Sequence, residues 1–215
     1  MVFEKKPKIG IVVGLKSEKK TLSSKYNLFV ESGYGKKAYN AAKRVINQNV
    51  DFIVSFGLAG SMTAKLKNSE IIIPKVILSE ELKSKKTSTF SNNYFKKKSK
   101  ENIISDVKLF TSEKILNNNS RSLKVDAVDM EAGYVLKAAQ EHKVPFTSVK
   151  VIFDDLDNPI PNFLVTSINE DGELKIWDLM FEILKNPLRI KNLLKMNKIY
   201  NRSMHKLEIT ASQLF

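Results

Sequence analysis

The chain has 215 residues, 42% of them hydrophobic and 27% charged, so it can bury the core of one domain or of two small ones. It contains no cysteine, which excludes disulfides, thiolate metal sites and a cysteine nucleophile. The only two histidines, His142 and His205, argue against a histidine-rich metal site. The composition therefore predicts a metal-free protein of the reducing cytoplasm.

The formal charge of +13 comes mostly from lysine. Such a charge fits either a nucleic-acid or anionic-membrane partner, or lysines spread over solvated faces. Arginine occurs at only four positions, and a basic stripe with interleaved aromatic residues is missing, so we favour solvated faces and expect no nucleic-acid partner. No stretch reaches the roughly 18 apolar residues of a membrane span, and the short apolar run after Lys8 lacks the features of a signal peptide.

Short apolar runs closed by glycine or polar residues predict strands along most of the chain. In chain order they are Lys8–Gly14, Asn27–Gly33, Val50–Gly57, Glu70–Leu78, Val107–Phe110 and Val144–Phe153. Helical spacing predicts helices at Lys36–Asn47, Met130–His142 and over most of Glu173–Lys206, with a break at Pro187. Pro74 indicates an edge position or a bend. Residues 83–101, rich in Lys, Ser and Asn, predict a mobile surface loop.

Strands and helices alternate, and the strands are almost continuously apolar. This pattern predicts a single α/β domain over residues 1–215, with a mostly parallel, buried sheet and helices on both of its faces. In such sheets, ligands bind beyond the carboxyl ends of the strands.

Acidic residues follow three of the predicted strand ends. Glu18 follows the first strand, Glu131 opens a helix beside Asp129, and Asp154 and Asp155 follow the last strand. If the strands are parallel, these carboxyls meet at one edge, where separated carboxyls suit glycosyl chemistry. There are two alternative explanations. Asp129 and Glu131 can be favourable charges near a helix N-terminus, and the acids after the last strand can belong to a polar turn. The glycines near the strand ends likewise fit either close approach to a ligand or tight turns.

Several segments, read in order, resemble the purine nucleoside phosphorylase and nucleosidase superfamily. They are IGIVVGLKSE, SGYGKKAYNAA, DFIVSFGLAGSMTAKLKNSEIIIP, LFTSEKIL, AVDMEAGYVLKAA and VPFTSVKVIFDD, and together they span nearly the whole chain. The resemblance implies the superfamily's α/β fold and cleavage of the bond between ribose and a purine, with adenine as the expected base. It implies no metal or organic cofactor, although phosphate can serve as co-substrate.

The resemblance also implies roles for individual residues. Asp154 corresponds to the acid that protonates or hydrogen-bonds the purine at N7, and Glu18 to the residue that holds the attacking water. Glu131, with Met130 beside it, corresponds to the group that binds the ribose hydroxyls. The residues expected around the purine are Ile115, Leu116, Ala59 and Gly60.

Within the superfamily, the SFGLAG turn, the VDME helix start and the C-terminal extension are similar to the hopanoid-associated phosphorylase branch. That branch implies adenosylhopane, a lipid-linked adenine nucleoside, as substrate. Two features depart from the family's pattern: Phe153 replaces a small residue before the catalytic Asp, and no Arg matches the phosphate-binding positions. Both motivate the alternative of a catalytically inactive binding protein, and the second also favours water over phosphate. A homodimer is expected from the resemblance alone.

The extension at about 183–206 alternates apolar residues with seven lysines and arginines. Beyond Pro187 the apolar residues recur every three or four positions, as in an amphipathic helix with a basic face. Such a helix either packs its apolar stripe on the domain or docks on anionic lipid. The first alternative places the protein in the cytoplasm, and the second at the inner face of a membrane.

Overall fold

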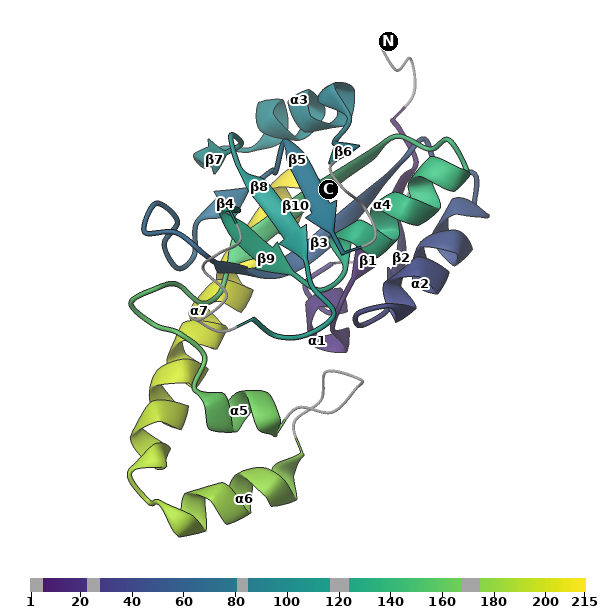
Figure 1. The fold of residues 1–215 in the computed structure, drawn as a ribbon. Helices are drawn as coiled ribbons and strands as arrows, with labels where there is room; N and C mark the ends of the chain where they lie inside the picture. Colours follow the sequence, from purple (N-terminus) through teal and green to yellow (C-terminus); the bar gives the residue numbers. More distant parts are fainter. Residues whose placement is uncertain (1–5, 23–27, 81–84, 117–123, 168–174) are drawn as a thin grey trace.

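The computed structural model describes residues 6–22, 28–80, 85–116, 124–167 and 175–215. These residues form one α/β unit built on a curled sheet (Figure 1). The strands are β1 Ile9–Val13, β2 Leu28–Ser32, β3 Phe52–Ser61, β4 Ile71–Ile72, β5 Val76–Ser79, β6 Lys85–Lys86, β7 Ile103–Ile104, β8 Lys108–Thr111, β9 Ala127–Asp129 and β10 Phe146–Ile152. The helices are α1 Lys16–Lys19, α2 Lys37–Ile46, α3 Thr89–Lys98, α4 Ala132–Glu141, α5 Asn162–Thr166, α6 Ile176–Lys185 and α7 Arg189–Leu214.

The sheet is mixed but mostly parallel, as predicted. At its centre, β3 pairs in parallel with β1 and with β10, so the carboxyl ends of these three strands lie at one edge. Beyond the pairing of Ala59 with Ile152, β3 continues as an antiparallel partner of β9, with Gly60 opposite Val128. The curl therefore begins on β3. The predicted strand Glu70–Leu78 is two strands, β4 and β5, separated by the bend at Pro74.

Helices cover both faces of the sheet, which explains the almost continuous apolar strands. Along β1, Val12 packs into the core beneath α2 and α4, whereas Ile11 and Val13 face the opposite core. That second core is closed by aromatic and aliphatic side chains of α3 and of the C-terminal half of α7. Because alternate residues of a strand point to opposite faces, both sets must be apolar.

Helix α3 contradicts the predicted loop at residues 83–101. Residues 83 and 84 lie outside the described residues, but Thr89–Lys98 is helical. The Ser88 side chain caps the helix by accepting a hydrogen bond from the Ser91 backbone N–H. Phe95 is fully buried and makes edge-to-face contacts with Phe52 and Phe215. One buried aromatic residue anchors a helix whose remaining residues are too polar to show a helical period.

The C-terminal tail is helical, with the predicted break between α6 and α7 around Pro187. From its eighth residue onward, α7 buries side chains that include Met196, Ser203, Leu207 and Leu214. The preceding part of α7, with α6, extends away from the sheet (Figure 1). Packing on the domain is therefore found only from about Met196 onward. No helix in the described residues is long and apolar enough to cross a membrane.

Candidate active site

Three of the acidic residues singled out in the sequence lie at the carboxyl edge of the central strands. Each carboxyl packs directly against a glycine. A Cβ added at Gly57 would lie 2.6 Å from Glu18 Oε1, one at Gly14 would lie 2.9 Å from Glu131 Oε1, and one at Gly60 would lie 2.8 Å from Asp154 Oδ1. These glycines therefore give the carboxyls the space they occupy. This contact is with the protein's own carboxyls, a role that the two interpretations made from the sequence did not include.

Glu18 is buried on the short helix α1, and backbone groups fix its carboxyl. Its Oε2 accepts hydrogen bonds from the N–H groups of Gly14 and Leu15, both 2.9 Å, and its Oε1 accepts one from Leu58, 2.8 Å. Burial raises the pKa of Glu18, while the positive charge of Lys150 and the three N–H donors oppose that rise. The carboxyl thus has a fixed orientation beside the end of β1.

Glu131 lies immediately before α4 and is 7% exposed. Its Oε1 accepts a hydrogen bond from the Gly35 N–H at 3.2 Å, where Gly35 has a φ of 55° that favours glycine. Burial raises the pKa of Glu131 to about 8; the charge of Lys150 opposes the rise, and the acidic neighbours Asp129 and Glu18 add to it. Next to it, Met130 accepts a hydrogen bond at Sδ from the Tyr34 hydroxyl, 3.0 Å.

Lys150, which the sequence analysis did not single out, is the cation among these carboxyls. It lies on β10 with 1% exposure, and its Nζ is 2.9 Å from Asp129 Oδ2. Burial alone would lower the pKa of Lys150, but the carboxyls around it outweigh burial and raise it. Asp129 also accepts hydrogen bonds from the Thr111 hydroxyl and from the Ala132 N–H at the start of α4. Asp129 therefore lies at the N-terminus of α4, as one alternative proposed, and it also binds the lysine.

The neighbouring residues Asp154 and Asp155 have different surroundings. Asp155 accepts hydrogen bonds from the backbone N–H groups of Asn68, Asp157 and Asn158 and from the Asn158 side chain. Burial opposes ionisation, but these hydrogen bonds outweigh it and lower the pKa of Asp155. Burial raises the pKa of Asp154 to about 7, and the Asp155 charge adds to the rise. Asp155 thus stabilises the turn after β10, and Asp154 is the carboxyl that exchanges a proton near neutral pH.

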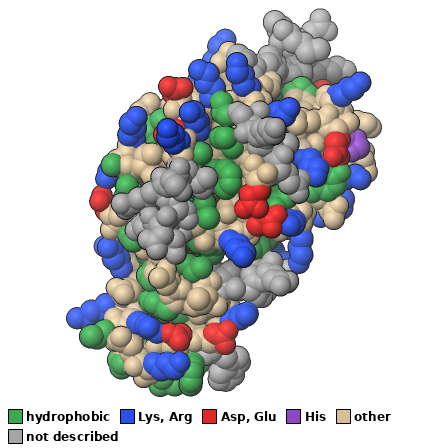
Figure 2. Space-filling model, in the orientation of Figure 1, with side chains coloured by type: hydrophobic (Ala, Val, Ile, Leu, Met, Phe, Trp, Pro, Cys, Tyr) green, Lys and Arg blue, Asp and Glu red, His purple; other side chains and the backbone are tan. Residues whose placement is uncertain are grey.

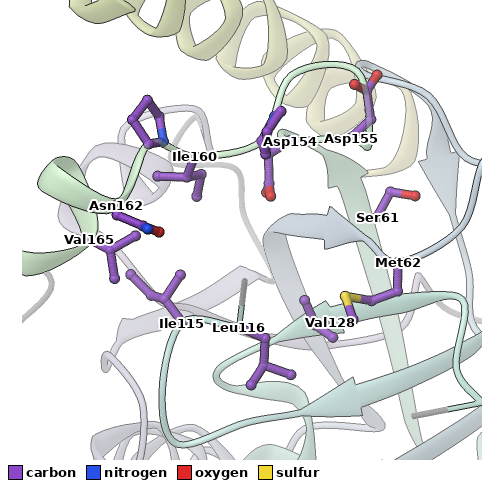
Figure 3. Close-up of a pocket in the computed structure, with 12 residues that line it drawn as sticks. Ser61, Met62, Ile115, Leu116, Val128, Asp154, Asp155, Ile160, Asn162 and Val165 are labelled. Carbon is purple, nitrogen blue, oxygen red and sulfur yellow. The ribbon is translucent and has the colours of Figure 1, made fainter. Parts of the chain in front are cut away.

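A cavity of about 290 Å³ lies in front of Asp154. Figure 3 shows the Asp154 carboxyl pointing into it and the Asp155 carboxyl pointing away. Its walls come from the end of β3, from β9, from the segment after β8 and from α5 with the residues before it. The lining residues are Ser61, Met62, Ile115, Leu116, Val128, Asp154, Asp155, Pro159, Ile160, Pro161, Asn162 and Val165. A mostly apolar cavity with one protonatable carboxyl suits a flat, weakly basic ligand.

Phe153 does not displace the Asp154 carboxyl. The Phe153 ring packs edge-to-face against Tyr200 of α7, with ring centroids 5.9 Å apart. The Phe153 N–H donates to the Ala59 carbonyl, and the Ser61 N–H donates to the Asp154 carbonyl, both at 2.8 Å. These backbone bonds hold the end of β10 against β3, so the bulky residue is accommodated on the α7 side.

Known proteins resemble this chain over nearly its whole length. It is 26% identical to the 5′-methylthioadenosine/S-adenosylhomocysteine nucleosidase of Buchnera aphidicola subsp. Baizongia pistaciae, over 87% of this chain and 95% of that protein. The structure of the Helicobacter pylori enzyme of the same name, complexed with an aminopyrrolopyrimidine-substituted pyrrolidinol, matches with a TM-score of 0.68 and 16% identity, covering 97% of each chain. The chain has the nucleosidase fold.

A further nucleosidase with the same name, from Colwellia psychrerythraea and in complex with adenine, matches with a TM-score of 0.65 and 15% identity. The match covers 99% of this chain and 94% of that one. These relatives are enzymes that act on adenine nucleosides. No protein-family model matches the chain.

Of the residues expected around the purine, Ile115 and Leu116 line the cavity, whereas Ala59 and Gly60 do not. Ala59 is 5% exposed in β3, and Gly60 lies against the Asp154 carboxyl. The sequence analysis missed Lys150 and the cavity wall formed by α5 and the residues before it, whose lining side chains are apolar except for Asn162. The signal that could have identified Lys150 is its position as the single charged residue in the apolar run VPFTSVKVIF. A charge buried in a strand requires a partner of opposite charge, so this lysine predicts a nearby carboxyl.

Proposed function

We propose that this protein hydrolyses the N-glycosidic bond of an adenine nucleoside. The observation that carries the proposal is the Asp154 carboxyl, which points into a mostly apolar cavity and has a pKa of about 7. A carboxylic acid that is still partly protonated at neutral pH can protonate a leaving base at N7, so that the base departs without a negative charge. The similarity to nucleosidases that act on adenine nucleosides supports the choice of substrate.

The other two carboxyls complete the proposed mechanism. As the bond to the base lengthens, the ribose gains positive charge. That charge favours the ionised form of Glu131, whose pKa is about 8, and the ionised carboxyl stabilises the ribose through the 2′ and 3′ hydroxyls. Glu18, held by three backbone N–H groups, orients a water molecule toward the anomeric carbon and accepts the proton that the water loses as its oxygen bonds to that carbon. Lys150 favours the ionised forms of both glutamates against the effect of burial.

Water is the proposed nucleophile in place of phosphate. Within the described residues, no lysine or arginine lines the cavity, and the buried Lys150 is paired with Asp129. A phosphate dianion placed beside Glu18 and Glu131 would be repelled by these buried carboxyls, and their neighbouring cation, Lys150, already pairs with Asp129. A neutral water molecule carries no such electrostatic cost.

The sequence resemblance to the hopanoid-associated branch names adenosylhopane as a finer candidate for the substrate. The α5 wall of the cavity supports it, because Pro159, Ile160 and Val165 present apolar surface to the ligand. The alternative of an inactive binding protein loses its main support, since Phe153 packs on Tyr200 and leaves Asp154 in the cavity.

The experiment is to incubate the protein with 5′-methylthioadenosine, adenosine and a 5′-alkylthioadenosine with a long chain, each with and without phosphate. We expect free adenine and free ribose products at equal rates in both buffers. Release that requires phosphate, with a ribose 1-phosphate product, would contradict hydrolysis. Binding of all three compounds without any release of adenine would establish the inactive binding protein. A long-chain substrate that reacts fastest would favour the lipid-linked nucleoside.

Glu131→Gln is expected to weaken the binding of a nucleoside much more than the binding of adenine. The amide is neutral and accepts fewer hydrogen bonds from the ribose hydroxyls, and a hydrogen bond to a charged group contributes about 1.5–3 kcal/mol. Calorimetric titration of adenine and of a non-hydrolysable nucleoside measures both affinities. Equal losses for the two ligands would show that Glu131 supports the start of α4 and does not contact ribose.

A further inference from the structure

The C-terminal arm, residues 175–202, carries an exposed hydrophobic surface that the proposed function does not use. In the described residues, the exposed large hydrophobic side chains all belong to it: Met180 (47% exposed), Phe181 (59%), Leu184 (76%), Leu188 (71%), Ile190 (45%) and Leu194 (65%). Single exposed apolar residues are ordinary, but several gathered on two successive helices and their connection mark a contact surface. Figure 1 shows this arm extending from the end of the molecule opposite α3.

The same arm carries a concentration of positive charge. It has seven lysines and arginines and two carboxylates, Asp178 and Glu182, and Glu182 is paired with Arg189 and Lys185. On α7, Lys191, Lys195, Lys198 and Arg202 follow one another at intervals of four, three and four residues, and so form one stripe on the helix. Figure 2 shows basic and hydrophobic side chains together at this end of the molecule.

The exposed apolar residues of α7 lie next to that stripe and away from the domain. Ile190 and Leu194 each directly precede a lysine of the stripe, while the side buried on the sheet carries Met196, Ser203 and Leu207. The arm therefore presents a basic face bordered by an apolar face, both directed outward. This is the arrangement of helices that lie in a membrane interface, with apolar groups among the acyl chains and basic groups among the headgroups.

We infer that the C-terminal arm docks the protein on the surface of an anionic lipid bilayer. A second copy of the chain fits the arm poorly, because a symmetric contact would bring two basic stripes together. A nucleic acid would satisfy the lysines but would leave the leucines and Phe181 against phosphate and water. An anionic bilayer satisfies both faces at once.

Docking of the arm also sets the position of the cavity. Helix α5, which supplies one cavity wall, packs on α6, and α6 packs on α7. The Arg189 guanidinium lies 5.2 Å from the centre of the Phe163 ring of α5. The bound arm would therefore hold the α5 wall of the cavity close to the lipid headgroups.

The test is co-sedimentation of the full chain with vesicles of phosphatidylcholine, with and without phosphatidylglycerol, at low and at high salt. We expect binding to the anionic vesicles alone, weakened by salt. Lys191→Glu/Lys195→Glu/Lys198→Glu should lower the partition coefficient by at least about 100-fold, at roughly five-fold for each basic group near the surface. Leu184→Ser/Leu194→Ser should also lower it, because the apolar face is lost. The matched control is Lys96→Glu/Lys97→Glu/Lys100→Glu, which makes the same charge change on and beside α3 and should bind as the wild type does.

Several outcomes would overturn the inference. Absence of binding to anionic vesicles at low salt would do so directly. An equal loss in the α3 control would show that overall charge, and not the arm, attracts the protein to lipid. Self-association in sedimentation velocity that Leu184→Ser/Leu194→Ser abolishes, without vesicle binding, would assign the arm to a second copy. Binding to single-stranded RNA in preference to vesicles, with sensitivity to the lysines alone, would assign it to nucleic acid.

Discussion

Asp154→Asn is expected to lower turnover by about 10²–10⁴-fold while the fold and the affinity for ligand are retained. The amide fills the same space against Gly60 and can still hydrogen-bond to the purine, but it cannot deliver a proton. Steady-state release of adenine measures turnover, and binding of adenine measures the retained site. Loss of turnover without loss of binding is the result that the proposed role of Asp154 requires.

The matched control for this variant is Asp155→Asn. Its carboxylate accepts four hydrogen bonds in the turn after β10, and an amide group would direct its NH₂ toward donors. We therefore expect Asp155→Asn to lower the free energy of unfolding by about 1–3 kcal/mol and to leave most of the activity in the folded protein. An inactive Asp155→Asn beside a fully active Asp154→Asn would reverse the assignment of the two residues.

The raised pKa of Asp154 makes a linked prediction about pH. The acid acts in its protonated form, so turnover should fall as the pH rises above about 7.

The unfolded chain binds fewer protons at this residue than the folded one between pH 4 and 7, so wild-type stability is lost as the pH rises through that interval. Asp154→Asn removes this pH-dependent loss of stability. The free energy of unfolding of the variant should therefore exceed that of the wild type by an amount that grows from pH 4 to pH 8 and reaches roughly 1–3 kcal/mol. Denaturant unfolding at a series of pH values measures the difference.

Lys150→Met is expected to lower the free energy of unfolding by about 3–5 kcal/mol, because it leaves buried carboxyls without their cation. Methionine preserves most of the volume, so the loss reports on charge more than on packing. The matched control is Lys67→Met, whose exposed ion pair with Asp157 should be of little consequence. The double variant Lys150→Met/Asp129→Asn should recover part of the loss, since it removes both partners. A Lys150→Met protein as stable as the wild type would show that the carboxyls need no cation.

The sequence was informative where chemistry leaves a local pattern. Apolar runs closed by glycine predicted the central strands, and acids after strand ends predicted that Glu18, Glu131 and Asp154 would lie at one edge. Helix α3 was missed because one buried aromatic residue, Phe95, makes most of its contacts with residues far away in the chain. The different surroundings of Asp154 and Asp155 also could not be predicted, since they depend on Asn68, which is distant in sequence.

The contacts of β3 separate two properties of the site, namely the spacing of its carboxyls and the shape of its outer wall. Evolution can therefore change these two properties independently. Gly57 and Gly60, both on β3, make room for the carboxyls of Glu18 and Asp154. The distance between these two glycines is set by about 10 Å of regular strand backbone. That strand is paired on both sides and tolerates little change. The outer wall at α5 rests instead on the arm, away from the sheet. Substitutions in α5 can therefore alter which ligands fit the cavity, while the spacing of the two carboxyls stays the same.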